Sequence, residues 1–160
     1  MIYQALIQSH LNYMAICYAY RKVNSNLKSL QRMQNKALKS VYNLPRNFST
    51  LSLFNNIAKS ILPVHGLHIY QVLVYVFKCI NSIGYHRIVF PRHQGTVDTR
   101  GRLNLRTPLR RLEWTKQRID FVGPNSYNCL PLEIKSLTSI SKFKLCCKNY
   151  ILDRVETLLC

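Results

Sequence analysis

The chain has 160 residues, of which 48% are hydrophobic and 11% aromatic, so it is long enough and apolar enough to build a core without disulfides or metals. Lysine and arginine number 23 against 6 aspartate and glutamate residues, which gives a formal charge of +17. These values exclude a peptide toxin and a disordered tail, and they favour a polyanion or an anionic surface as partner.

The acidic residues are confined to the end of the chain. Residues 1–97 carry eleven basic side chains and no carboxylate. The acids are Asp98, Glu113, Asp120, Glu133, Asp153 and Glu156. Because carboxylates are absent from the first half, that half has no acid to offer for catalysis.

The six cysteines do not follow a recognisable secretory signal, since the opening stretch to Tyr20 has no charged start and no convincing cleavage site. We therefore expect a reduced intracellular protein, in a nuclear or cytoplasmic ribonucleoprotein. The most apolar window, Leu67 to Ile80, is shorter than the about 20 residues that a bilayer span needs, so no membrane span is predicted.

The first half of the chain predicts helices. Apolar residues at three- and four-residue steps predict a helix over residues 2–20, followed by a turn at Asn24 to Asn26. The clearest helix is predicted from Leu27 to Tyr42, stopped by Pro45. Ser49 or Thr50 caps a short helix through Ile57, and Pro63 suits the start of a longer one over residues 66–81.

Glycine and proline interrupt the helical pattern after residue 82. We expect a linker over residues 83–99 and then a small β-hairpin or extended insertion around residues 100–122, with a second strand at Gln117 to Val122. A turn at Gly123 and Pro124 follows, and Ser139 or Ser141 caps a last helix. The predicted fold class is mainly α, with a helical region 1–82, the linker 83–99 and a strand-containing segment plus C-terminal helix over 100–160.

The helix predicted at residues 27–42 has two faces. Leu27, Leu30, Met33, Gln34, Ala37, Leu38 and Val41 fall on one side. The other side carries Lys28, Arg32, Lys36 and Lys39, which repel by about a few tenths of a kcal/mol per adjacent pair and have no carboxylate to relieve them. This pattern predicts contact with phosphates, and the alternative is an ordinary solvated face.

A second basic region lies in the middle of the chain. Its members are Arg100, Arg102, Arg106, Arg110, Arg111, Lys116 and Arg118. Guanidinium groups take phosphate oxygens bidentately, and the nearby Trp114 and Tyr127 could provide stacking platforms for bases. The alternative is that Trp114 and Tyr127 are core residues and the arginines are rim charges.

Metal and catalytic chemistry are not predicted. His65 and His68 could share a helix face, but no cysteine pair has zinc spacing, and the adjacent Cys146 and Cys147 point in different directions on a helix. Metal-dependent nucleotidyl transfer needs clustered carboxylates, whereas these acids are scattered singly. We therefore expect no enzyme activity, no metal and no cofactor, although a cysteine–histidine pair brought together by the fold stays open.

Several stretches resemble, in the same order, the segment after the polymerase palm in non-LTR retrotransposon reverse transcriptases of the jockey-like kind. The similar stretches are LIQSHLNY at 6–13, LQRMQNKAL at 30–38, YNLP at 42–45, ILP at 61–63, VFKCIN at 76–81, RTP at 106–108, GPNSYNCLP at 123–131, FK at 143–144 and YIL at 150–152. Tyr127 stands where the family usually has tryptophan. The likeness covers residues 2–152.

The resemblance implies a thumb-side role: holding template RNA and primer during reverse transcription. The family's paired-aspartate motif and endonuclease domain would lie upstream of Met1, so the resemblance implies a C-terminal fragment without catalytic activity of its own. Implied partners are RNA or an RNA/DNA duplex and the palm region of a complete reverse transcriptase, with no small-molecule substrate. Gly123, Pro124, Asn128, Leu130 and Pro131, which match the family signature, are interpreted as structural.

Two other functions stay open from the sequence. One is an independent basic RNA-binding or ribosome-associated protein, which would have a closed surface. The other is a cationic membrane-surface protein, which requires basic and apolar faces exposed together. A piece of a polymerase would instead expose apolar side chains on the first helix, near Ile2, Leu6 and Tyr13.

Overall fold

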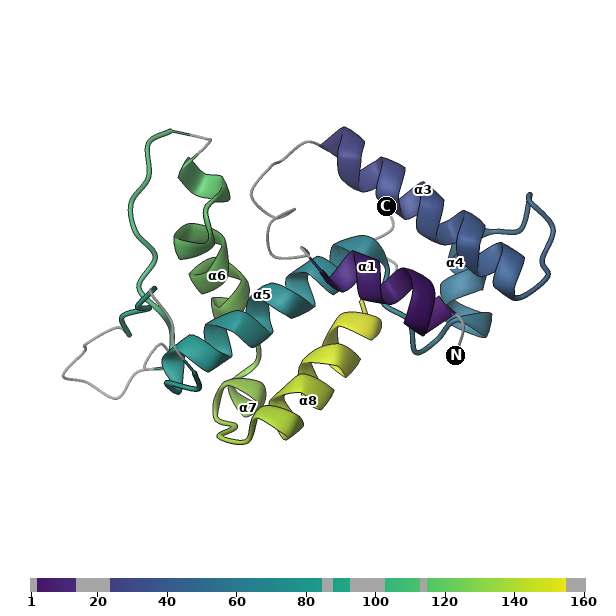
Figure 1. Cartoon of the computed structure of the whole chain (residues 1–160). Coiled ribbons are helices and arrows are strands. Elements are labelled where there is room, and N and C mark those ends of the chain that lie inside the picture. Colours follow the sequence, from purple (N-terminus) through teal and green to yellow (C-terminus); the bar gives the residue numbers. More distant parts are fainter. Residues whose placement is uncertain (1–2, 14–23, 85–87, 93–102, 113–114, 155–160) are drawn as a thin grey trace.

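The computed structural model describes residues 3–13, 24–84, 88–92, 103–112 and 115–154, and these residues form a mainly helical fold (Figure 1). This confirms the predicted fold class. The elements in chain order are η1 Gln4–Gln8, α1 Ser9–Asn12, α3 Asn24–Val41, α4 Thr50–Ser52, η2 Leu53–Ile57, α5 Val64–Ile80, η3 Thr115–Gln117, α6 Ile119–Asn128, α7 Leu132–Lys135 and α8 Ile140–Leu152.

Helix α5 runs through the middle of the molecule, with α6 and α8 packed against it and α3 near its N-terminal end (Figure 1). Its largely apolar sequence suits a helix that is covered on several sides. Phe77 of α5 stacks on Phe143 of α8 with ring centroids 4.0 Å apart. This core includes buried residues from Leu62 to Ile151. Phe90, which lies in the linker predicted at residues 83–99, is one of them, so residues before and after that linker share one core.

A second, smaller core lies under α3. Its buried members are Tyr3, Leu38, Leu53, Phe54, Ala58 and Ile61. The apolar face of α3 is narrower than the sequence predicts, because Met33 and Val41 are exposed while Gln34 and Leu38 are buried. Most of the surface of α3 is therefore open to solvent, where polar and charged side chains can lie.

Helix α3 begins at Asn24, so the turn predicted at Asn24 to Asn26 is wrong. It ends at Val41, before Pro45, as predicted. The end is a Schellman motif: Asn43 has a φ of 52°, its N–H donates to the Ser40 carbonyl (3.2 Å), and the Leu44 N–H donates to the Lys39 carbonyl (2.8 Å). The left-handed residue turns the chain back beneath the helix.

The strand predicted at Gln117 to Val122 is wrong, because these residues lie in η3 and the first turns of α6. The turn predicted at Gly123 and Pro124 is also wrong, since both lie inside α6 and are buried. Of the predicted hairpin, the described residues show one antiparallel bridge, between Arg92 and Leu105, and no strand. A stretch of six residues, such as Gln117 to Val122, is too short for its sequence pattern to separate a strand from a helix.

Candidate nucleic-acid interface

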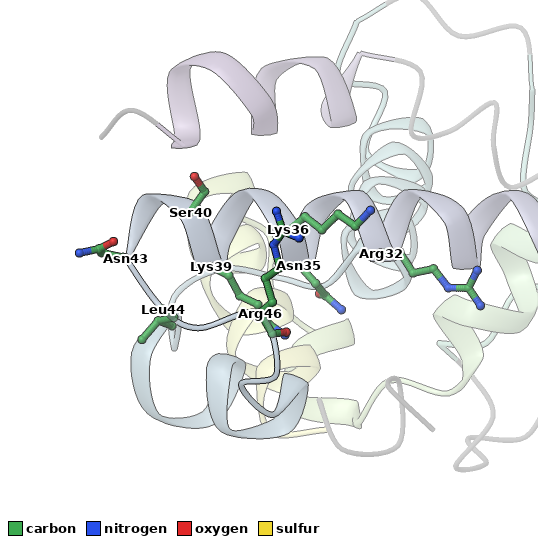
Figure 2. A pocket seen from close by; sticks show the side chains of 8 residues that line it. All are labelled: Arg32, Asn35, Lys36, Lys39, Ser40, Asn43, Leu44 and Arg46. Atoms are coloured by element: carbon green, nitrogen blue, oxygen red, sulfur yellow. The ribbon is translucent and has the colours of Figure 1, made fainter.

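A groove of about 770 Å³ lies between α3 and the chain that folds back after it. Its lining residues are Arg32, Asn35, Lys36, Lys39, Ser40, Asn43, Leu44 and Arg46 (Figure 2). Those on α3 recur at three- and four-residue intervals, so they form one face of the helix. Arg46 comes from the returning loop and completes the groove from the other side.

The groove is cationic. Four of its lining residues are Arg32, Lys36, Lys39 and Arg46, and no carboxylate is among the residues that line it. The Lys39 ammonium donates to the Arg46 carbonyl oxygen at 2.8 Å, which ties the loop to the helix. Arg32, Lys36 and Arg46 are exposed and keep their donors available for an anion in the groove.

Buried glutamines hold α3 in place. Gln34, which is 1% exposed, donates to the Tyr3 hydroxyl (2.7 Å) and to the Leu62 carbonyl (2.9 Å). The side-chain oxygens of Gln34 and Gln31 both accept from the Val64 N–H, at 3.0 and 2.8 Å. That amide is at the first residue of α5, so α3 caps the N-terminus of the central helix.

Asn35 extends this network toward the groove. Its side-chain oxygen accepts from Gln31 at 2.8 Å, and its amide donates to the Thr50 hydroxyl at 3.3 Å. Thr50 is the first residue of α4. The cationic face therefore lies on a helix that is hydrogen-bonded to α4 and to α5, rather than on a loop.

The structure brings together Arg32, Lys36 and Lys39 of the four helix cations predicted as contacts. Lys28 is exposed on the same helix but does not line the groove. Arg46, Asn35, Ser40 and Asn43 were missed. The position of Arg46 depends on the left-handed turn at Asn43, which charge spacing does not report.

The second basic region is only partly free. Arg110 is ion-paired with Asp120, and the Arg118 Nε lies 3.6 Å from the other carboxylate oxygen of Asp120. Arg106 and Arg111 are exposed. Arg100, Arg102 and Trp114 lie outside the described residues. Among the described arginines of this region, Arg106 and Arg111 are therefore the exposed ones outside the ion-paired cluster around Asp120.

Tyr127 is not a stacking platform, because only 3% of it is exposed. Its ring is part of the core around α5, and burial raises the pKa of its hydroxyl. The prediction that it stacks on bases is wrong. An aromatic residue at this position is explained by packing instead.

Asn128, a second residue of the signature, has structural contacts as well. The Asn128 side chain accepts from the Leu105 N–H (2.8 Å) and donates to the Leu105 carbonyl (2.9 Å), so it pairs with the backbone as a strand would. Lys135 is buried and donates to the Asn104 side chain (2.9 Å) and the Asn128 carbonyl (2.7 Å). These contacts fasten Leu105 to α6 and Asn104 to α7, and the interpretation of Asn128 as structural agrees with them.

Other reactive groups do not gather into a site. Within the described ranges, no group of three or more histidine, cysteine, aspartate or glutamate residues could hold a metal ion. Cys147 is buried, and burial raises the pKa of its thiol to about 12. A thiol with that pKa is a poor nucleophile at neutral pH.

The chain matches no protein-family model, no curated protein and no solved structure. The resemblance to jockey-like reverse transcriptases therefore stays a prediction from the motifs. Among the described helices, none is long and apolar enough to span a membrane.

Proposed function

We propose that this protein binds the sugar–phosphate backbone of RNA or an RNA/DNA duplex through the groove on α3, as the thumb-side segment of a jockey-like reverse transcriptase. The observation that carries the proposal is the groove itself, which is lined by four cationic residues and by no carboxylate. Phosphates are the anions that arginine and lysine bind most readily along an extended surface.

The sequence around the groove supports a polyanion rather than an acidic protein segment of the same chain. Residues 1–97 have no carboxylate, so the groove has no internal competitor from its own half. The lining hydroxyl of Ser40 and the lining amide of Asn43 can add hydrogen bonds to sugar or phosphate oxygens. Contacts of this kind position a nucleic acid without reading its sequence.

The assignment to a reverse transcriptase rests on the ordered motifs. The exposed apolar side chains of Leu6, on η1, and Tyr13, directly after α1, support a piece of a larger assembly over an independent domain with a closed surface. Among the motif residues, Gln34 and Asn128 make structural hydrogen bonds, and Arg32 and Lys36 line the groove. We therefore assign the chemical step to another part of such an enzyme. We expect no primer extension by the purified chain with Mg²⁺ and nucleotides.

A salt titration tests the binding. Fluorescence anisotropy with an RNA/DNA duplex is measured between about 50 and 200 mM salt, and four phosphate contacts predict a slope of log affinity against log salt of about −3 to −4. The double charge reversal Arg32→Glu with Lys36→Glu is expected to lower the affinity at least about tenfold and to flatten the slope.

The matched control is Lys142→Glu with Lys144→Glu, which makes the same change in net charge at two exposed positions of α8. The control is expected to retain most of the affinity, because its lysines do not line the groove. Equal losses in both double variants would mean that total charge, not the groove, attracts the nucleic acid. Salt-independent binding would contradict phosphate neutralisation altogether.

A further inference from the structure

A second cavity lies on another part of the surface, beside the bridge between Arg92 and Leu105. It has a volume of about 530 Å³ and is lined by two stretches, residues 89–91 and 106–110, together with Asp120 of α6. The Arg106 N–H donates to the Pro91 carbonyl at 2.8 Å, which holds the two stretches together. The cavity is thus formed by chain segments that are bonded to each other.

The walls of this cavity are apolar and unusually exposed. Val89 is 83% exposed and Leu109 is 102% exposed, one from each stretch, and Pro91 and Pro108 also line the cavity. Neither exposed side chain contributes to either core. Two large apolar side chains that flank one cavity without packing on the protein are suited to contact a flat apolar ligand.

The polar groups at the cavity favour an anion next to that ligand. Arg106 is exposed and lines the cavity, and Arg111 is exposed close by in sequence. The lining carboxylate, Asp120, is ion-paired with Arg110 and lies 3.6 Å from the Arg118 Nε. Its negative charge is therefore largely neutralised and does not oppose a phosphate.

We propose that this cavity receives one unpaired base of a single-stranded nucleic acid, with the adjoining phosphate on Arg106. Bases taken out of a stack are held between aromatic or apolar side chains, and their phosphates by arginine. A duplex keeps its bases stacked and cannot fill the cavity. The cavity therefore adds a preference for single strands to the phosphate binding on α3, and in this respect it rests on the proposed function.

The test compares single-stranded RNA with an RNA duplex of the same sequence, using the double variant Val89→Ser with Leu109→Ser. Because the variant removes the apolar surface that an unpaired base would contact, it is expected to bind the single strand about tenfold more weakly and the duplex within about twofold of wild type. An otherwise identical strand with abasic sugars is expected to bind wild type and variant equally. Circular dichroism checks that both proteins are folded. We expect the variant to fold, because both substituted side chains are exposed.

The control variant is Leu145→Ser, an exposed leucine of α8 that does not line the cavity. If wild type binds both nucleic acids and the double variant changes neither, or weakens both equally, the base site is overturned while the phosphate groove stands. If wild type binds neither, the proposed function fails and the base site fails with it. Self-association of wild type that the double variant abolishes in sedimentation would assign the cavity to a second copy and would also overturn the inference.

Discussion

Gly123 of α6 lies so close to Val76 of α5 that a Cβ atom at Gly123 would be 2.8 Å from the Val76 Cγ2 atom. The same Cβ would be 3.3 Å from the Phe90 ring. Val76 is fully buried, so its methyl group has little room to move. The glycine therefore sets the distance between the two helices, and it also lets the chain at Phe90 reach the core.

Gly123→Ala should destabilise the fold although alanine is the better helix former. Overpacking of a core costs about 1–3 kcal/mol, while the gain in helix propensity is about 1 kcal/mol, so we expect a net loss of up to about 2 kcal/mol. Urea unfolding followed by circular dichroism measures it. Adding Val76→Ala should remove most of the clash, and additive losses in the double variant would contradict this explanation.

Gln34→Leu should be strongly destabilising, because it keeps the volume but removes the donors to the Tyr3 hydroxyl and the Leu62 carbonyl. Two buried polar groups left without a partner predict a loss of about 2–4 kcal/mol in the free energy of unfolding. Asn56→Leu, at an exposed position, is the control and should change stability by less than about 0.5 kcal/mol. A loss for Gln34→Leu no larger than the control would show that the network contributes little.

Asn128→Ala should release the segment that begins at Leu105 from α6, since both backbone groups of Leu105 lose their side-chain partner. Limited trypsin digestion gives a direct measurement, because Arg106 and Arg111 follow in the same segment. Cleavage after these arginines should speed up several-fold relative to wild type. Asn125→Ala removes only the bond to the Thr107 hydroxyl, at 3.2 Å, and should leave the cleavage rate nearly unchanged.

Cys147 should resist alkylation in the folded protein at pH 8. Burial raises the pKa of its thiol to about 12 from the ordinary 9.0, so almost no thiolate is present, and the sulfur is also covered. Iodoacetamide labelling with peptide mass mapping should find Cys129, which is exposed, modified before Cys147. Labelling of Cys147 at the same rate as Cys129 without denaturant would contradict its burial.

The same shift has a consequence for stability. Between pH 9.0 and about 12 the unfolded thiol loses its proton while the folded thiol keeps it, so the unfolded state is favoured increasingly as pH rises. Unfolding midpoints should fall over this range, and Cys147→Ala should make the fall shallower. An unchanged pH profile in that variant would show that other groups dominate.

Helices with a clear apolar period were predictable from the sequence. The helix expected at residues 27–42 is Asn24–Val41, and the one expected at 66–81 is Val64–Ile80. Helix α6 was not predictable, because glycine and proline disfavour a helix locally. Contacts of Gly123 with Val76 and Phe90 exist only in the folded chain and override that preference.

The candidate site was also predictable only in part, because some of its residues come together only in the folded chain. Charge spacing placed Arg32, Lys36 and Lys39 on one face, because helix geometry relates sequence to surface. Arg46 lines the groove because of a turn with positive φ at Asn43, and this turn was not predicted from the sequence. Tyr127 was predicted to be a stacking platform but is buried. An aromatic side chain near arginines in the sequence is equally suited to a core.

The Schellman motif after α3 also bears on how an anion would be captured. The backbone bonds of Asn43 and Leu44, with the bond from Lys39 to the Arg46 carbonyl, fix the returning loop before any ligand arrives. Little backbone conformational entropy is then lost when Arg46 engages a phosphate, so association avoids the cost of ordering a loose loop. Capture should be limited by diffusion and ionic attraction rather than by a slow rearrangement of the protein.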